Sequence, residues 1–403
     1  STARTMAGES VEAARDAWHL TLVEGDRVQS RDHYRATVRY VGKVDGATPE
    51  EDWIGIEWDV EGRGKHNGSA KGKRYFECAE GYGSFVRGET MLVAPTSFQD
   101  AFLNKYASED AASAEEKMNF REAGRKKAAV VCELVGKDRE VQRMAKTTDL
   151  CEVTLSQSLI SHAGDTEWVR ENATGIESLA LDDNLIKDWE TVTALTAQLP
   201  KLNTLTVNGN KLKTLPSTLP REVFAGAFPC LKKLALNGTG VDLQQVGLLK
   251  SVLLLLTDLR LASNKISSIA AALPFEGWPA LELLDLSDNV LSSWDEVLQL
   301  SAFPSLQRLL LSGNQLERIH FPAAAPAQAE EATAPAGGGF GELRLLAVAN
   351  NKLGEWGSME ALRVLPKLAE LRVQGNAVCE AMGSTATRQM LIATLPGLAS
   401  VNG

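Results

Sequence analysis

The sequence predicts a multidomain protein, with a small all-β barrel first and an α/β solenoid of repeated units after it. Two observations carry this prediction. Between Gly25 and Val93, short runs rich in Val, Ile, Tyr and Trp alternate with Gly and Asp, which is typical of short strands joined by turns. From Leu150 onward, one leucine pattern returns at intervals of about 25 residues, and such a period is the signature of stacked repeats.

Length and composition exclude several classes of protein. The 403 residues exceed one typical domain, and the hydrophobic content of 44% supports more than one core. A formal net charge of −10 argues against general nucleic-acid binding, which needs a basic face over most of a domain. The longest apolar run, residues 246–256, contains Lys250 and is shorter than the roughly 20 residues of a membrane span. Five scattered cysteines without a C-x-x-C pair indicate a reduced, cytosolic setting and no zinc site.

The first domain and its connection to the repeats have predicted limits. We expect a flexible N-terminus over residues 1–19 and the barrel over residues 20–94. Apolar residues after Ser97 have the spacing of one helical face, so a helix is expected to begin near this residue. Residues 107–127 are charged and poor in large apolar side chains, which predicts a helical and charged linker over residues 95–146.

The second domain, predicted over residues 147–403, matches the pattern L-x-x-L-x-L-x-x-N-x-L nine times and is therefore a leucine-rich-repeat solenoid. The matches are led by Leu150, Ile176, Leu202, Leu231, Leu256, Leu281, Leu306, Leu343 and Leu368. Each repeat is expected to lay one strand beside its predecessor, because no single unit can bury its own leucines. A buried asparagine amide after each strand, replaced by Thr239 in one repeat, can satisfy backbone groups left open by the turn.

Segments outside the strands are also predicted. Residues 294–303 and 359–368 indicate helices, so the outer face of the solenoid is expected to be helical. Residues 322–341 are rich in Ala, Pro and Gly and are predicted to be a disordered insertion. Residues 387–403 are predicted to form a helix and a strand that shield the last leucines.

The stretch GRGKHNGSAKGKRYFECAEGYGSFV (62–86) is the strongest candidate for a binding site. It is not a phosphate-binding loop, since Gly68 to Gly72 is one residue short, Arg74 replaces Ser or Thr, and no helix follows. Its basic residues have no acid among them between positions 63 and 74: Arg63, Lys65, Lys71, Lys73 and Arg74. Flanking aromatic rings beside this charge suit a peptide that ends in an aromatic residue and carboxylates.

Residues 53–87 strongly resemble the CAP-Gly domain, a cytoskeleton-associated module. The predicted fold class is thus an N-terminal small all-β CAP-Gly barrel followed by an α/β leucine-rich-repeat solenoid. The resemblance implies capture of the acidic, aromatic C-terminal tail of α-tubulin. It assigns tail binding to Trp53, Lys65, His66, Asn67, Phe85 and Arg87. The loop reads G-K-H-N-G where the family has G-K-N-D-G, which removes one anionic group and adds a titratable one.

Several other residues near this loop have alternative predicted roles, in ligand binding or in the structure of the barrel. Lys71, Lys73 and Arg74 form either a basic rim that steers an acidic tail or only a solvated edge. The glycines Gly55, Gly72, Gly81 and Gly83 are predicted to form turns rather than ligand contacts. Trp58 and Phe76 belong either to the core or to the groove. His66 is not expected to bind a metal, because no second His or Cys lies at ligand spacing.

A CAP-Gly domain followed by leucine-rich repeats, with WDEVLQL inside one repeat, resembles the tubulin-folding cofactor E family, also called tubulin-specific chaperone E. The resemblance implies a non-catalytic chaperone that binds α-tubulin and works with cofactors B, C and D to assemble or dissociate the αβ-tubulin dimer. It also implies a cytoplasmic, cytoskeleton-associated monomer with no cofactor, metal, nucleic acid or membrane partner. Family members carry a ubiquitin-like domain after the repeats, and nothing up to residue 403 matches it, so we expect either a fragment or a protein without that module.

The exposed strand positions of the repeats offer a second candidate surface. One residue lies between the last two leucines of each strand, and four such residues are candidates for partner contact: Arg260, Asp285, Leu310 and Arg372. The alternative is that they only cover the sheet.

Two other functional classes are less well supported. The five histidines are scattered and no Ser/His/Asp grouping is present, so an enzyme is not expected. A microtubule-associated adaptor would use the same groove on polymer or on other proteins with acidic, aromatic tails. Such adaptors carry coiled-coil heptads, and the sequence has none.

Overall fold

The computed structural model describes residues 18–45, 52–107, 147–216, 221–269, 278–322 and 339–402. They form two compact units. The first unit takes in the described residues through Ala107 together with Ser156–Asp165 and Asp183–Thr191, and the second takes in the others. The predicted flexible N-terminus up to residue 17, the predicted linker after Ala107 and the predicted insertion between 323 and 338 lie outside the described residues.

The first unit is built on a five-stranded antiparallel sheet with strand order β6-β3-β2-β1-β7. Its strands are β1 (Arg27–Ser30), β2 (Arg35–Gly42), β3 (Trp53–Trp58), β6 (Gly83–Val86) and β7 (Leu92–Val93). Side chains alternate across β3, so Ile54, Ile56 and Trp58 enter the core while the residues between them face outward. Trp58 is thus a core residue, and its Nε1 donates to Ser84 Oγ at 2.9 Å.

Shorter elements complete this unit. They are η1 (Trp18–Thr21), β4 (Ser69–Ala70), β5 (Lys73–Arg74), α2 (Gly88–Met91), β8 (Thr96–Ser97), α3 (Phe98–Phe102), η2 (Leu103–Ala107) and β10 (Ile160–His162). The helix predicted near Ser97 begins at Phe98, and Ser97 Oγ caps it by accepting from the Asp100 N–H at 2.9 Å. Strand β8 pairs in parallel with β10, which explains why residues 156–165 join this unit.

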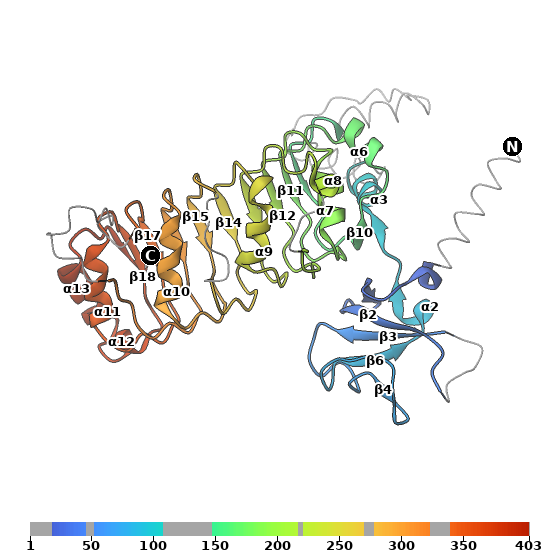
Figure 1. Ribbon diagram of the computed structural model, residues 1–403, viewed down its shortest axis with the longest axis horizontal. Helices are drawn as coiled ribbons and strands as arrows, with labels where there is room; N and C mark the ends of the chain where they lie inside the picture. The colour runs from blue at the N-terminus through green and yellow to red at the C-terminus, as the bar shows by residue number, and fades with distance from the viewer. Residues whose placement is uncertain are drawn as a thin grey trace, which may run out of the picture. The chain divides into compact units, whose positions relative to one another are not determined.

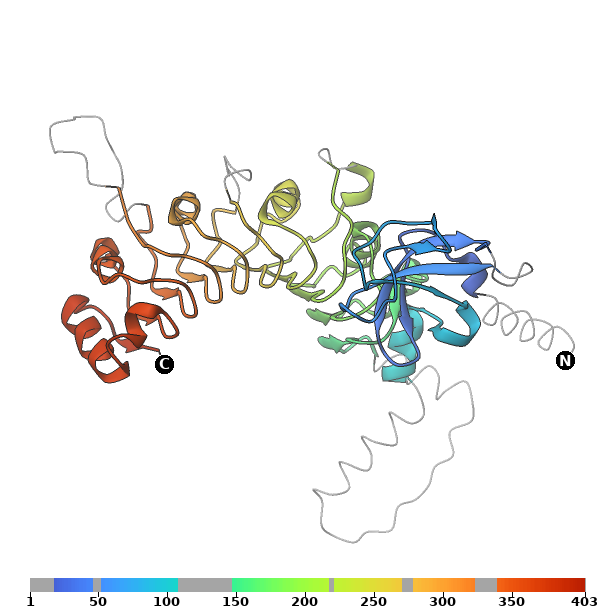
Figure 2. The same cartoon turned by 90° about the horizontal axis from the view of Figure 1, so that it is seen from below.

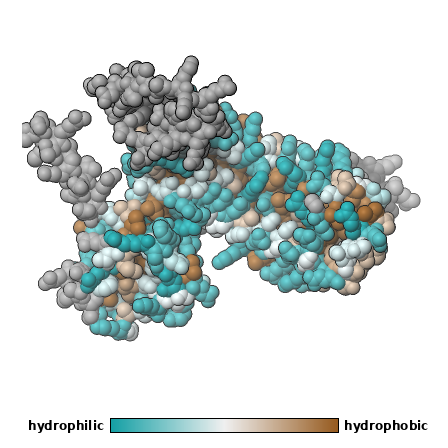
Figure 3. Space-filling view, turned by 180° about the vertical axis from the view of Figure 1, so that it is seen from behind, coloured by the Kyte–Doolittle hydropathy of each residue, from teal (hydrophilic) through white to brown (hydrophobic). Residues whose placement is uncertain are grey.

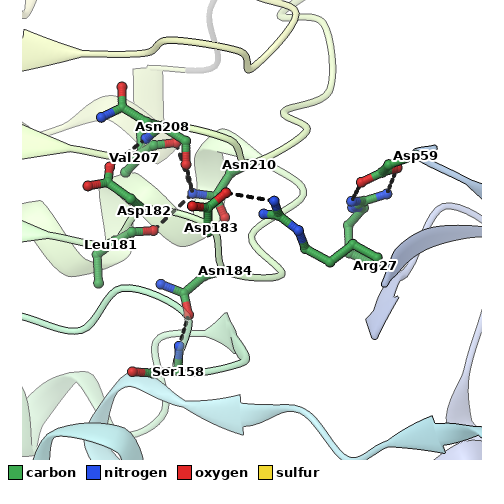
Figure 4. A network of polar contacts seen from close by, with 11 residues as sticks. Arg27, Asp59, Ser158, Leu181, Asp182, Asp183, Asn184, Val207, Asn208 and Asn210 are labelled. Carbon is green, nitrogen blue, oxygen red and sulfur yellow. Dashed lines mark hydrogen bonds and ion pairs between the residues drawn. The ribbon is translucent and has the colours of Figure 1, made fainter. Parts of the chain in front are cut away.

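Ion pairs stabilise the first unit at several places. Arg27 is almost completely buried and pairs with Asp59, and Figure 4 shows the two facing each other. Arg27 also donates to Thr37 Oγ1 at 2.8 Å, so this buried charge is paired and hydrogen-bonded through its terminal nitrogens, while its Nε is buried without a partner in the described part of the chain. Within the same unit, Arg35 reaches Asp183 at 2.6 Å.

The second unit is a leucine-rich-repeat solenoid with one ten-stranded parallel sheet. Its strands are β9 (Glu152–Thr154), β11 (Ser178–Ala180), β12 (Thr204–Thr206), β13 (Lys233–Ala235), β14 (Asp258–Arg260), β15 (Leu283–Asp285), β16 (Arg308–Leu310), β17 (Leu345–Ala347), β18 (Glu370–Arg372) and β19 (Ser400–Val401). Each of the nine predicted repeats places its strand two residues after its leading residue, so the predicted register is confirmed.

Helices lie along the side of the solenoid opposite the strands, as Figures 1 and 2 show. The helical segments of the repeats are α6 (Thr166–Asn172), α7 (Trp189–Thr196), α8 (Arg221–Phe224), α9 (Leu243–Leu248), η3 (Leu249–Ser251), α10 (Trp294–Leu298), η5 (Gln299–Ala302), α11 (Gly357–Ala361) and η6 (Leu362–Val364). Helices α12 (Ala377–Glu380) and α13 (Ser384–Thr394) follow them at the C-terminal end (Figures 1 and 2). Helix α13 and strand β19 close the end of the sheet, which confirms the predicted terminal helix and strand.

A ladder of buried asparagines holds successive turns of the solenoid together. In Asn289, Nδ2 donates to the carbonyls of Leu261 and Leu286 at 3.0 and 2.9 Å, and Oδ1 accepts from the N–H groups of Asn264 and Ile266. Figure 4 shows the equivalent bond from Asn210 to the Leu181 carbonyl, 2.9 Å long. The amides therefore satisfy the backbone groups that each turn leaves open, as predicted.

The face drawn in Figure 3 is mostly hydrophilic, with hydrophobic residues in limited patches. Among the described residues, no helix combines the length and apolar character that crossing a bilayer requires.

Candidate peptide-tail site on the barrel

Five aromatic side chains gather on the outer face of the barrel, and we call this group the aromatic face: Tyr40, His66, Tyr75, Phe76 and Phe85. Phe85 on β6 is its centre. Its ring centroid lies 5.0 Å from that of His66, 5.4 Å from Tyr75 and 5.5 Å from Phe76. Phe76 is buried, whereas the other four side chains are half-buried, so the face presents apolar ring surface to solvent.

A glycine makes room for this arrangement. Gly55 lies opposite Phe85 in the β3–β6 pair, and a Cβ atom there would lie 2.6 Å from Phe76 Cε1 and 2.9 Å from Tyr40 Cβ. The prediction that Gly55 and Gly83 form turns is wrong, since both lie in strands. Gly72 and Gly81 do lie in turns, each with a φ of +81°.

Trp53 and Arg87 lie on the same outward side of β3 and β6 as Gly55 and Phe85. The Arg87 guanidinium sits 5.3 Å from the centre of the Trp53 ring, which is cation–π geometry. The Trp53 Nε1–H is buried and has no hydrogen-bond partner in the described part of the chain. The structure thus brings together two of the predicted tail-binding residues beside the aromatic face.

The G-K-H-N-G loop is fixed against β6 by its backbone. The N–H groups of Gly64 and Lys65 donate to the carbonyls of Gly81 and Gly83 at 2.8 Å each, and Gly83 N–H donates to the His66 carbonyl at 2.7 Å. Lys65 is exposed, and its ammonium forms no ion pair with any residue that the structure describes. The loop is therefore fixed by backbone hydrogen bonds, and it carries at Lys65 a positive charge that no described acid pairs with.

His66 and Asn67 take up fixed positions in this loop. His66 Nδ1 accepts a hydrogen bond from Gly68 N–H at 3.0 Å. Burial lowers the pKa of His66 below its usual value, and the charge of Glu80 opposes this shift. Asn67 is half-buried, and its carbonyl accepts from Cys78 N–H at 3.4 Å.

Two of the three residues of the predicted basic rim form ion pairs with acidic residues. Lys73 pairs with Asp45 at 3.0 Å and Arg74 pairs with Glu77 at 3.5 Å. Lys71 is exposed in the turn between β4 and β5, with a φ of +48°.

Arg63 was also expected to add its charge to the basic loop, but this charge is compensated within the barrel. Its guanidinium lies 3.7 Å from the Tyr34 ring centre and 4.7 Å from that of Trp58, and it also pairs with Asp32. Arg63 is therefore an internal structural group of the barrel.

Two residues that shape the aromatic face, Tyr40 and Asp45, were not predicted from the sequence. Tyr40 joins the aromatic face because the register of β2 shifts between Val38 and Tyr40, so Tyr40 lies opposite Gly55. Asp45 N–H donates to the Tyr75 hydroxyl at 2.8 Å, which holds this segment against the face. The only pattern in the sequence that bears on the position of Tyr40 is the alternation of apolar residues in β2. Without the register shift, this alternation would place Tyr40 on the core side of the strand.

The four candidate residues of the repeats lie in one row across the strand face. Strand pairing sets Arg260 beside Asp285 and Asp285 beside Leu310, and Arg372 lies two strands further on, after Ala347. Arg260 is held by Asp258 at 3.1 Å, whereas Arg372 is exposed and makes no ion pair with a described residue. Leu310 and Asp285 are half-buried.

These features define the class of chains that join a CAP-Gly module to a leucine-rich-repeat scaffold. Family models match this assignment, with the CAP-Gly domain over residues 24–91 and the leucine rich repeat over residues 255–316. In the described residues, no group of three or more His, Cys, Asp or Glu side chains is arranged to hold a metal ion.

Three relatives then give the particular family. The chain is 31% identical to tubulin-folding cofactor E of Arabidopsis thaliana, over 95% of this chain and 70% of that protein. It is 32% identical to tubulin-specific chaperone E of Bos taurus, over 94% and 69%. It is 31% identical to tubulin-specific chaperone E of Homo sapiens, over 94% and 68%. The chain belongs to the tubulin-folding cofactor E family, also named tubulin-specific chaperone E.

Proposed function

We propose that this chain is a cytoplasmic tubulin-folding chaperone whose barrel captures the acidic, aromatic C-terminal tail of α-tubulin. The names of its relatives support the chaperone role. One observation carries the tail-binding part: exposed Lys65, which forms no ion pair with a described residue, directly precedes His66, whose ring centroid lies 5.0 Å from that of Phe85. The protein acts by binding, together with cofactors B, C and D, to assemble or dissociate the αβ-tubulin dimer.

The chemistry of the face fits such a tail. A carboxylate binds the Lys65 ammonium, and the terminal aromatic ring packs against Phe85 and Tyr75. A charge-assisted hydrogen bond contributes about 1.5–3 kcal/mol, and an aromatic pair adds about 0.5–1.5 kcal/mol beyond area burial. After the cost of association, a few such contacts give an affinity of roughly micromolar order.

A second surface on the same chain strengthens this binding. The strand face of the repeats offers half-buried Leu310 with the exposed guanidinium of Arg372 nearby in the sheet. Arginine with an apolar neighbour is the composition of many protein interfaces. Because both surfaces belong to one chain, tail capture raises the effective concentration of the tubulin body near the repeats toward the millimolar range.

We expect Lys65→Ala to weaken binding of αβ-tubulin by about 10-fold to 100-fold, the loss of one charge-assisted contact. Tubulin stripped of the last α-tubulin residues is expected to bind the parent chain and the variant equally. The measurement is affinity by pulldown or anisotropy, with Lys213→Ala as a control for the loss of one exposed lysine on the solenoid. A Lys65→Ala chain that distinguishes intact from stripped tubulin as well as the parent does is incompatible with the proposal.

We expect Leu310→Glu to weaken binding of intact and stripped tubulin by a similar factor, about 10-fold, because the repeats contact the body and not the tail. Thr154→Glu, at the equivalent position of β9, is the matched control and should have a smaller effect. If the two variants lost the same amount of affinity for tubulin, the residues around Leu310 would not be the surface that contacts the tubulin body. Thermal unfolding of both variants checks that the sheet remains intact.

A further inference from the structure

We propose that the C-terminal end of the solenoid contains a second binding site, for a ligand that joins a small apolar body to one carboxylate. The site is a cavity of about 560 Å³ that is open to solvent. One wall comes from η6 and the residues that follow it, and the other comes from the end of α13 and the residues that lead to β19. All of these residues belong to the second unit, so the inference does not depend on tail capture by the barrel.

The sequence of the last turn explains why this space is not filled by the protein. In earlier turns of the solenoid, the residue just before the leading leucine of the strand carries a side chain: Lys201, Cys230, Leu255, Ala280, Ser305 and Lys367. In the last turn this residue is Gly397, which lines the cavity. A Cβ atom at Gly397 would lie 3.6 Å from the carbonyl oxygen of Leu368 on the facing wall. A larger side chain at this position would therefore enter the cavity.

The walls of the cavity are mainly aliphatic. Four leucines and two prolines contribute to them: Leu362, Leu365, Pro366, Leu368, Leu395 and Pro396. Val364 and Ile392, each next in sequence to a lining residue, are 42% and 49% exposed. The volume lies within the range of about 300–1,000 Å³ that is usual for small-molecule sites. An apolar ligand body would therefore leave water for a surface of matching chemistry.

Arg363 provides the only charge among the ten described residues that line the cavity. Its Nε donates to the carbonyl of Thr394, the last residue of α13, at 3.0 Å. This bond satisfies a carbonyl that the helix end leaves open and holds the guanidinium at the cavity. The two terminal nitrogens form no hydrogen bond or ion pair with a residue that the structure describes. They can therefore bind both oxygens of one carboxylate.

The charges nearby also favour an anion over a cation. Helix α13 contains no acidic residue, and its Arg388 is exposed without an ion pair to a described residue. Lys367 is already paired with Glu342 at 2.5 Å. Glu360 on α11 precedes Arg363 by three residues, but it is exposed to water, which screens its charge. The guanidinium therefore determines the sign of the charge that the cavity accepts.

The test titrates the full chain at pH 7 with anilinonaphthalene sulfonate, a fluorescent aromatic monoanion. Gly397→Leu places a side chain in the cavity and should weaken dye binding by at least about 10-fold. Arg363→Gln should weaken it by about 10-fold, the effect of one charge-assisted contact, and Arg363→Lys should recover part of this loss. The matched control is Ala280→Leu, which adds the same side chain at the equivalent position of an earlier turn and should bind the dye as the parent does. Thermal unfolding checks that each variant stays folded.

Two competitors then distinguish the possible sources of such a ligand. Decanoate represents a free amphiphile, and N-acetyl-Leu-Leu with a free carboxylate represents the end of a peptide. The competitor that displaces the dye at the lower concentration identifies the source. Only dye that is lost in Gly397→Leu and kept in Ala280→Leu is assigned to the cavity.

Three results would overturn the proposal. The first is equal dye binding by the parent chain, Gly397→Leu and Arg363→Gln, which would mean that the cavity holds no dye. The second is a loss in Gly397→Leu with no loss in Arg363→Gln, which would leave an apolar cavity without selectivity for anions. The third is dye that neither decanoate nor the acetylated dipeptide displaces.

Discussion

Replacing Phe85 by alanine is expected to weaken tail binding by at least about 10-fold, because this ring contacts every other member of the aromatic face. Truncation of a fully buried Phe costs about 3–5 kcal/mol, and Phe85 is half-buried, so the barrel should lose about 2 kcal/mol of unfolding free energy. The affinity for a Glu-Glu-Tyr peptide should fall to less than about a tenth. Peptide titration and denaturant unfolding of the full chain measure the two effects.

The control for this change is Phe85→Leu, which keeps a large apolar side chain but removes the ring. It should preserve most of the stability and lose most of the aromatic contribution to binding. If Phe85→Ala bound the peptide as the parent chain does while the barrel stayed folded, the aromatic face would not be the surface that binds the terminal aromatic ring of the peptide.

The second large effect is expected from Asn289→Ala in the solenoid. This change leaves the carbonyls of Leu261 and Leu286 and the N–H groups of Asn264 and Ile266 without their amide partner. Each buried backbone group left unsatisfied costs about 1–3 kcal/mol, so a total loss of about 3–5 kcal/mol is expected after local relaxation. Denaturant unfolding followed by circular dichroism measures this loss.

In another repeat, Thr239 occupies the position that Asn289 has in its own repeat, so it shows how a hydroxyl can replace the amide. Thr239 donates through Oγ1 to the Leu236 carbonyl at 2.7 Å, while Asn264 Oδ1 accepts from the Thr239 N–H at 2.9 Å. Asn289→Thr should therefore recover part of the stability that Asn289→Ala loses. Equal stability of Asn289→Ala and the parent chain would mean that the amide ladder does not hold the turns.

The positions of the repeats could be predicted from the sequence because each repeat packs only against its neighbours and carries the same pattern of residues. Each leading leucine fixes the phase of one short strand, and the asparagine eight residues later marks the turn, as for Leu281 and Asn289. Stacking then follows from neighbour contacts alone. Cross-strand rows such as Arg260, Asp285 and Leu310 could be aligned without any structure for the same reason.

The barrel site could be predicted only in part, because its partners meet through long-range pairing. The loop residues Lys65 and His66 are contiguous, and the resemblance to a known module identified them together with Phe85. The register shift that turns Tyr40 outward leaves no mark in the alternation of β2. One of the acids that compensate the rim is also distant in sequence, since Asp45 reaches Lys73 across 28 positions.

The most direct test of tail capture maps where the tail end lies on the full chain. A peptide ending in Glu-Glu and a photoreactive phenylalanine analogue is cross-linked to the protein, and the modified residues are identified by mass spectrometry, with excess unlabelled peptide as competitor. The account predicts competable cross-links to the barrel, at Tyr40, Tyr75 or Phe85 and in the loop around Lys65. Competable cross-links confined to the repeats, or none in the barrel, would contradict it.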